Sequence, residues 1–296
     1  MNVLLQMVHI LDRGVYGFLN GFAGNWFVDH VASFEESDNL LKGGLFLAMY
    51  AALWFRVGPD QEHWRRTILA ILTGTLLALV VSRTIADIFP FRLRPMFDLT
   101  LPHHAYSLSI SRNMMDWSSF PSDTSAYFVA LAFGLVQLLP RYSVTILLYT
   151  ASWICLPRMF LGEHYLSDIV VGAAIGMAAV KASLASEWLQ RSIVSPVLHF
   201  VETKPQVFYG AAFLIFFEMG VMFDDVRFVA RGLFQALHTV SSRELLRATP
   251  TAFGILGVVL MAVALLFLPL ATSTVPLRSF RRERFLLLSF LSRMRP

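Results

Sequence analysis

The run from Arg158 to Asp168 contains an arginine, a histidine and an aspartate at positions 158, 164 and 168. Residues four apart share one face of a helix, so His164 and Asp168 form a nucleophile with a carboxylate that can orient it. The N–H groups of the Arg158 guanidinium match the oxygens of a phosphoryl group. The spacing therefore predicts a phosphoryl-binding site with a nucleophilic histidine.

A second arginine-bearing segment, residues 83–95, ends an apolar run and contains Arg83, Arg92 and Arg94. Arg83 would lie about 9 Å below the helix end if Phe89 is the last helical residue. An arginine at that depth is costly unless it faces a polar cavity, which makes Arg83 a candidate functional residue. A purely structural ion pair with Asp87, one turn on, is compatible with this role.

A third segment, residues 117–124, precedes another apolar run and ends in Pro121, Ser122, Asp123 and Thr124. Proline followed by serine, aspartate and threonine is typical of a helix start. Free backbone N–H groups and the positive end of the helix dipole at such a start bind phosphate readily. A simple helix cap is the alternative interpretation.

The composition predicts an all-α, polytopic transmembrane helix bundle that holds these segments together. The chain has 296 residues, of which 56% are hydrophobic and 15% charged, and its mean hydropathy is +0.61. That is too apolar for a soluble domain of this size. We expect six to seven spans. Strong ones lie at residues 40–57, 67–89, 123–140, 143–160 and 165–186, and weaker ones at 207–223 and 251–272.

The chain is expected to divide into four parts. Residues 1–39, which glycines and acidic residues interrupt, predict amphipathic helices at the membrane interface. Residues 40–186 form the helical core, and 187–276 add further spans and an outer segment. Residues 277–296 form a basic amphipathic tail on the cytoplasmic side. The net charge of +4 is modest and gives no indication of nucleic-acid binding.

The distribution of arginines and lysines near the span ends predicts that segments 83–95, 117–124 and 158–168 lie together on the outer face of the membrane. The compact loops and the absence of an Asn-x-Ser/Thr site fit an integral protein of a bacterial inner membrane. The site would then face the periplasm.

The order Arg-Pro, then Pro-Ser, then Arg-x5-His-x3-Asp resembles the type 2 phosphatidic-acid phosphatase superfamily of integral-membrane lipid phosphatases, over residues 40–186. The resemblance implies that His164 becomes phosphorylated and that Asp168 holds its imidazole. It implies that Arg94 and Arg158 bind the phosphoryl oxygens, with Ser122 and its helix terminus behind them. It implies no metal and no cofactor.

The third motif is intact apart from Pro157, where the family usually has serine. Two other departures from the family pattern matter more. Asp87 stands where the first motif has a lysine, and Arg83 or Arg92 could supply the missing charge; we favour Arg83. Thr124 stands where the second motif has the histidine that acts as general acid, a role typically worth roughly 10²–10⁴-fold in rate. With Asp123 before it, the motif reads Pro-Ser-Asp-Thr. Possible substitute acids are His103, His104, Glu163 and Asp123.

The absent acid favours a substrate whose leaving group needs little protonation. A phosphate leaving group is far less basic than an alkoxide, so we expect a metal-independent lipid phosphatase that removes the terminal phosphate of a polyprenyl diphosphate. Its partners would be this lipid and the bilayer, with the oligomeric state left open. Two alternatives remain: a phosphotransferase that passes the phosphoryl group to a lipid or glycan acceptor, and a family member that binds phospholipid without catalysis.

Overall fold

The computed structural model describes residues 3–101, 115, 117–226 and 229, and all regular structure in these ranges is helical. The predicted all-α class is thereby confirmed. The chain divides into two compact units. The first comprises residues 1–202 and 214–227 and contains every residue of the candidate site, and the second comprises residues 203–213 and 228–296.

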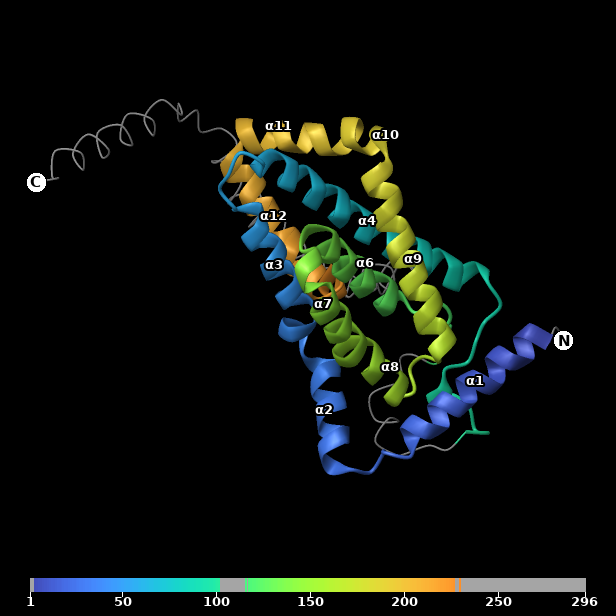
Figure 1. Cartoon of the computed structure of the whole chain (residues 1–296). Coiled ribbons are helices and arrows are strands. Elements are labelled where there is room, and N and C mark those ends of the chain that lie inside the picture. The colour runs from blue at the N-terminus through green and yellow to red at the C-terminus, as the bar shows by residue number, and fades with distance from the viewer. Residues whose placement is uncertain (1–2, 102–114, 116, 227–228, 230–296) are drawn as a thin grey trace, which may run out of the picture. The chain divides into compact units, whose positions relative to one another are not determined.

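Three helices form the centre of the first unit: α4 (Gln61–Ile88), α6 (Asp123–Leu138) and α9 (Leu166–Ala185). Each packs against the other two, as Figure 1 shows. Gly172 lets the backbone of α9 approach the start of α6 closely. A Cβ atom at this position would lie only 2.3 Å from the Ser122 carbonyl oxygen. Small residues at contacts between membrane helices permit such close approach. The start of α6 is thus held against the first turns of α9.

Residues Pro140–Phe160 form one long helical segment made of several pieces. After the short turn η4 (Pro140–Tyr142) come α7 (Ser143–Tyr149), the π-helical turn η5 (Thr150–Cys155) and α8 (Leu156–Phe160). The π-helical turn ends shortly before Pro157, which has no N–H to donate to the preceding turn. This wider turn precedes Arg158, which lies near the end of the segment.

Among the residues that the structure describes, three helices are long and apolar enough to cross a membrane: Gln61–Ile88, Pro140–Phe160 and Leu166–Ala185. Leu40–Trp54, which joins the π-helical turn η1 (Leu40–Gly44) to α3 (Leu45–Trp54), and Asp123–Leu138 are apolar but shorter. These segments coincide with the five strong predicted spans. The protein is therefore a helical membrane protein.

The segment after α9 begins with α10 (Glu187–Leu189), η6 (Gln190–Val194) and α11 (Ser195–Thr203). The next helix, α12 (Pro205–Gly220), overlaps the weaker span expected at 207–223. The span expected at 251–272 and the tail at 277–296 lie outside the described residues. The boundaries proposed within 187–276 stay predictions.

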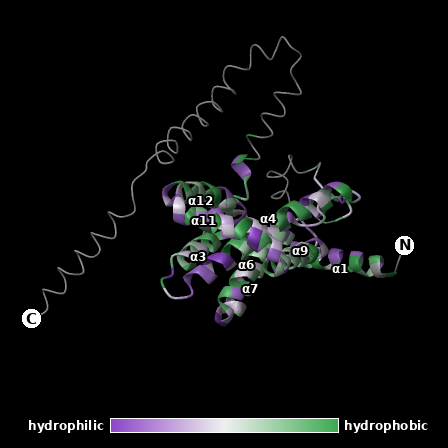
Figure 2. Cartoon of the chain, turned by 90° about the horizontal axis from the view of Figure 1, so that it is seen from above, coloured by the Kyte–Doolittle hydropathy of each residue, from purple (hydrophilic) through white to green (hydrophobic). Residues whose placement is uncertain are grey.

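Two helices precede the bundle, α1 (Val3–Asn20) and α2 (Trp26–Ser37). They belong to the same compact unit as the central helices: α1 packs against α8 and α9, and α2 against α8. Hydrophobic and hydrophilic residues are interspersed along α1 (Figure 2). Their predicted location at the membrane interface stays a prediction, but their packing brings them to the end of the bundle where His164 lies.

Candidate active site

A tight turn, residues 161–165, joins α8 to α9 and contains His164. Gly162 adopts a φ of +74°, a left-handed conformation that glycine takes without steric cost. The carbonyl oxygen of Arg158 accepts the backbone N–H groups of Glu163 at 3.0 Å and of His164 at 3.3 Å. The turn thus sets the position of the histidine relative to the arginine.

The imidazole of His164 is buried, with 3% of the residue exposed, and its Nδ1 lies 2.8 Å from the backbone carbonyl oxygen of Ser119. A carbonyl oxygen only accepts hydrogen bonds, so this contact requires the proton on Nδ1 and leaves a lone pair on Nε2. Burial and the nearby Arg94 guanidinium lower the pKa of His164 to about 4. At neutral pH the ring is therefore uncharged and can act as a nucleophile through Nε2.

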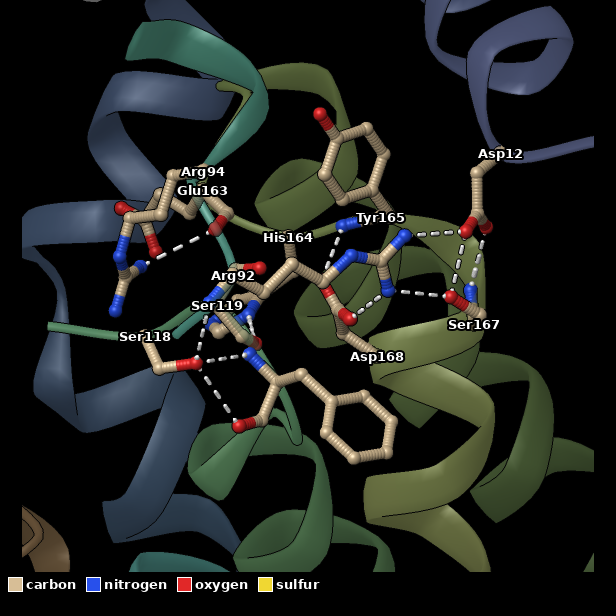
Figure 3. Close-up of polar contacts among 11 residues, drawn as sticks. Asp12, Arg92, Arg94, Ser118, Ser119, Glu163, His164, Tyr165, Ser167 and Asp168 are labelled. Carbon is tan, nitrogen blue, oxygen red and sulfur yellow. Dashed lines mark hydrogen bonds and ion pairs between the residues drawn. The ribbon is translucent and has the colours of Figure 1, made fainter. Parts of the chain in front are cut away.

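Ser119 is held in place by the loop that follows α4. Its backbone N–H donates to the carbonyl oxygen of Arg92 at 2.9 Å. The backbone N–H of Arg92 in turn donates to the Ser118 hydroxyl at 3.2 Å. Figure 3 shows Ser119 beside the His164 ring and Arg92 close to both. Two of the predicted segments thus meet the third at the histidine.

Arg94 is buried, with 6% of the residue exposed. Its Nη1 donates to the carbonyl oxygen of Glu163 at 3.2 Å, and its Nε to that of Trp117 at 3.4 Å. Burial lowers the pKa of Arg94. Since these hydrogen bonds run to neutral carbonyls, Arg94 is the site arginine whose positive charge is least offset by direct contacts.

Arg158 is equally buried but has two carboxylate partners. Its Nη1 donates to Glu163 Oε2 at 2.8 Å and also forms an ion pair with Glu36 Oε2. Although burial raises it, the pKa of Glu163 is lowered to about 2 by the attraction of Arg158. Glu163 is therefore a permanent negative charge beside His164.

Residues 45–192 match the model of the PAP2 superfamily. The chain belongs to the PAP2 superfamily. Membership implies an activity of the phosphatase or phosphotransferase type. Comparison with curated proteins found no match. The matched range contains the turn with His164 and the segments with Arg94 and Ser119, and it excludes α1 and α2.

The hydrogen bonds of Asp168 run to other groups than the His164 imidazole, so the orienting role that the PAP2 resemblance implied stays a prediction. Its Oδ2 accepts the backbone N–H of Tyr165 at 2.8 Å, and its Oδ1 pairs with Arg92 Nη1 at 2.5 Å. The carboxylate is fully buried and serves the first turn of α9, which needs an acceptor for its free N–H groups. The ring of His164 is oriented by the Ser119 carbonyl.

The guanidinium of Arg92 is occupied by contacts with protein side chains, whereas the phosphate-binding role expected for it requires free N–H groups. Its Nη2 pairs with Asp12 Oδ2 at 2.6 Å, its Nη1 donates to the Ser167 hydroxyl at 2.7 Å, and the guanidinium carbon lies 4.3 Å from the ring centre of Tyr165. Figure 3 shows the guanidinium between the two carboxylates of Asp12 and Asp168. These contacts fit a bracing role.

Asp12 and Glu36 are site residues that the sequence analysis did not identify, and both come from helices outside the PAP2 match. A signal for each was present, because Asp12 and Glu36 are among the acidic residues that interrupt the N-terminal 39 residues. What the sequence lacks is any indication of which arginine each carboxylate contacts.

At the start of α6, side chains of the same segment accept some of the free backbone N–H groups. Ser122 caps the helix by accepting the backbone N–H of Ser125 at 3.2 Å, and Asp123 Oδ1 accepts that of Thr124 at 2.8 Å. The terminus therefore offers fewer free N–H groups to phosphate than the PAP2 resemblance implied. Ser122 also donates its own N–H to the Asp168 carbonyl oxygen at 3.1 Å, which joins α6 to α9.

Arg83 lies beside this helix start. Its Nη1 is 3.9 Å from Asp123 Oδ2, and its Nε is 3.9 Å from Asp87 Oδ1. Its guanidinium carbon lies 4.2 Å from the ring centre of Trp117. The expected pair with Asp87 is thus present, and Arg83 also approaches Pro-Ser-Asp-Thr. Its phosphate-binding role stays a prediction.

Two further expectations concern groups that the structure does not test. His103 and His104 lie outside the described residues. Within residues 3–101 and 117–226, no cluster of three or more His, Cys, Asp or Glu side chains is arranged to hold a metal ion. Metal independence remains a prediction.

Proposed function

We propose that this PAP2 protein is a metal-independent lipid phosphatase that removes the terminal phosphate of a polyprenyl diphosphate at the periplasmic face of a bacterial inner membrane. The observation that carries the proposal is the buried His164, with Nδ1 bound to the Ser119 carbonyl oxygen and its pKa lowered to about 4. Such a ring presents an unprotonated Nε2 at neutral pH, as a phosphohistidine mechanism requires.

In this mechanism Nε2 of His164 attacks the terminal phosphorus in line, and the bond from phosphorus to the bridging oxygen breaks. The bridging oxygen leaves with the electron pair as part of a polyprenyl monophosphate. Arg94 takes up charge on the equatorial oxygens, because its contacts with neutral carbonyls leave its charge available for a transition state. Water then attacks the phosphohistidine, releases inorganic phosphate and loses a proton to solvent.

The substrate preference follows from Thr124. Without the general acid of the PAP2 second motif, an alkoxide would have to leave unprotonated, whereas the phosphate of a polyprenyl monophosphate leaves as a weak base. Asp123 approaches Arg83 at 3.9 Å. Its carboxylate also accepts the Thr124 N–H, so it is already committed to the helix start. We therefore base the preference on the leaving group and not on a substitute acid.

The test is phosphate release by the purified protein, with chelator present, from a polyprenyl diphosphate and from phosphatidic acid. His164→Ala is the blank. Release from the diphosphate alone, with an acid-labile phosphoenzyme that His164→Ala lacks, supports the proposal. Equal release from both lipids would contradict the leaving-group argument. Phosphorylation of an added lipid or glycan acceptor without free phosphate would identify a phosphotransferase, and binding without turnover a non-catalytic member.

A further inference from the structure

Glu36, near the end of α2, contacts Arg158, which the PAP2 resemblance assigns with Arg94 to the phosphoryl oxygens of the substrate. Its Oε2 forms an ion pair with Arg158 Nη1, the same nitrogen that donates to Glu163 Oε2 at 2.8 Å. A guanidinium Nη carries two hydrogens. Both hydrogens of Arg158 Nη1 therefore point to carboxylates, and a phosphoryl oxygen can reach this nitrogen only by replacing one of them.

The two carboxylates are not equally easy to replace. Glu163 belongs to the tight turn, its side chain is 5% exposed, and its backbone N–H is bound to the Arg158 carbonyl oxygen. Glu36 comes from a separate helix, and its side chain is 18% exposed. The carboxylate that can move without unfolding the turn is Glu36.

The surroundings of Glu36 also favour its release as a neutral acid. Burial and the negative charge of Glu163 raise the pKa of Glu36 to about 7. The charged groups that face it are Arg158 from α8, Glu163 from the turn, Lys42 from η1 and Glu35 from α2 itself. Lys42 Nζ lies 3.8 Å from Glu35 Oε1 and donates a hydrogen bond to the backbone carbonyl oxygen of Glu36. These contacts of Lys42 therefore run to groups other than the Glu36 carboxylate.

We propose that Glu36 is an internal anion that competes with the substrate for Arg158 and thereby sets which phosphoryl groups the site accepts. A tetrahedral dianion replaces the Glu36 carboxylate on Nη1, and the displaced carboxylate takes up a proton from solvent. A terminal phosphoryl group of high charge, as in a diphosphate, displaces it more readily than a singly charged phosphodiester. This inference rests on the proposed function, because a phosphoryl contact of Arg158 requires a phosphorylated substrate in the site.

The proposal makes anion binding dependent on pH in a defined direction. Below the pKa of Glu36 the carboxyl is already neutral and competes weakly, so the anion binds tightly. Above it, each pH unit weakens binding by up to about tenfold, because a proton must be taken up with the anion. Replacing the carboxylate by an amide removes this dependence.

The experiment uses full-length protein in detergent and tungstate, a phosphate-like dianion that does not itself titrate near neutral pH. Calorimetric titration at about pH 8 in buffers of different ionisation enthalpy counts the protons taken up. We expect wild type to take up close to one proton per tungstate. We expect Glu36→Gln to take up none and to bind about tenfold more tightly at pH 8 but equally well near pH 6. Glu187→Gln, which breaks an exposed ion pair with Arg191, is the matched control and leaves both quantities unchanged.

Equal or weaker binding by Glu36→Gln, or no proton uptake by wild type, would overturn the inference. A thermal melt checks folding, and Glu36→Asp, which shortens the reach to Arg158, gives an intermediate affinity if the amide variant does not fold. The inference and the proposed function fail separately. Proton-linked tungstate binding without lipid hydrolysis would support the competition by Glu36 and contradict the phosphatase activity. Lipid hydrolysis together with tungstate binding that does not depend on Glu36 would support the phosphatase activity and contradict the competition.

Discussion

Asp12 accepts two hydrogen bonds from Ser167, one from its backbone N–H at 2.8 Å and one from its hydroxyl at 2.6 Å, across a sequence separation of 155 residues. The same carboxylate pairs with Arg92, which pairs in turn with Asp168. A helix that precedes the PAP2 match thereby holds the first turn of α9, immediately after the turn that contains His164. The N-terminal helices are thus part of the site's framework.

This contact predicts that Asp12→Asn lowers both stability and turnover. The amide keeps the shape but removes the charge opposite Arg92, at an expected cost of about 1–3 kcal/mol, which is less than for a fully buried pair because Arg92 is partly exposed. Thermal unfolding in detergent and kcat for the polyprenyl diphosphate measure the two effects. Asp29→Asn, whose carboxylate accepts the N–H of Gly24 in an exposed setting, is the control. Identical melting of the Asp12 variant and wild type would show that the contact does not brace the site.

The contrast between Arg92 and Arg94 predicts opposite consequences for their replacement. Arg94→Ala should lower kcat/KM by about 10²–10³-fold, as does removal of one preorganised donor to a transition state, and should weaken tungstate binding. Arg92→Ala should instead lower the melting temperature, because it leaves Asp12 and Asp168 without their shared cation. Kinetics, titration and melting of both variants in parallel decide this. Weaker anion binding by the Arg92 variant alone would reverse the two assignments.

The pKa of His164 predicts the acid side of the pH profile. The ring is neutral in the folded state until the pH falls to about 4, well below its ordinary value of 6.5. Because the folded pKa is the lower one, the shift contributes stability that is present above pH 6.5 and is lost as the pH falls towards 4. We expect kcat/KM of Glu36→Gln, in which the competing titration is absent, to decline only below about pH 5. A decline centred near 6.5 would mean that the ring is solvated and not bound to Ser119.

The packing of α6 on α9 is tested by a matched pair of glycines. A Cβ at Gly172 would lie 2.3 Å from the Ser122 carbonyl oxygen, whereas one at Gly17 on α1 meets nothing within 4 Å. Gly172→Ala should therefore cost about 1–3 kcal/mol and reduce activity, because Ser122 and Asp168 must separate. Gly17→Ala should be neutral or slightly stabilising through helix propensity. Melting curves of the two variants give the comparison, and equal curves would refute the close contact.

The sequence predicts the bundle well because each strong span is a continuous apolar run, and hydropathy alone identifies such runs. It also places the arginines, the histidine and the helix start in three segments that the structure brings together. It does not predict the partner of His164, because the Ser119 carbonyl is a backbone group without a side-chain signature. Nor does it predict that Asp12 and Glu36 reach Arg92 and Arg158, since that depends on the path of helices remote in sequence.

The absent general acid gives the sharpest test of substrate choice. Thr124 lies in the first turn of α6 and is half-buried, and the resemblance to the PAP2 second motif leads us to expect a histidine at this position. Thr124→His should restore a proton donor for an alkoxide and raise phosphatidic acid hydrolysis by up to roughly 10²–10⁴-fold, while release from the diphosphate changes little. Phosphate release from both lipids gives the ratio, with Thr124→Asn as a polar variant that lacks the acid. An unchanged ratio in Thr124→His would mean that the leaving group does not explain why threonine is tolerated here.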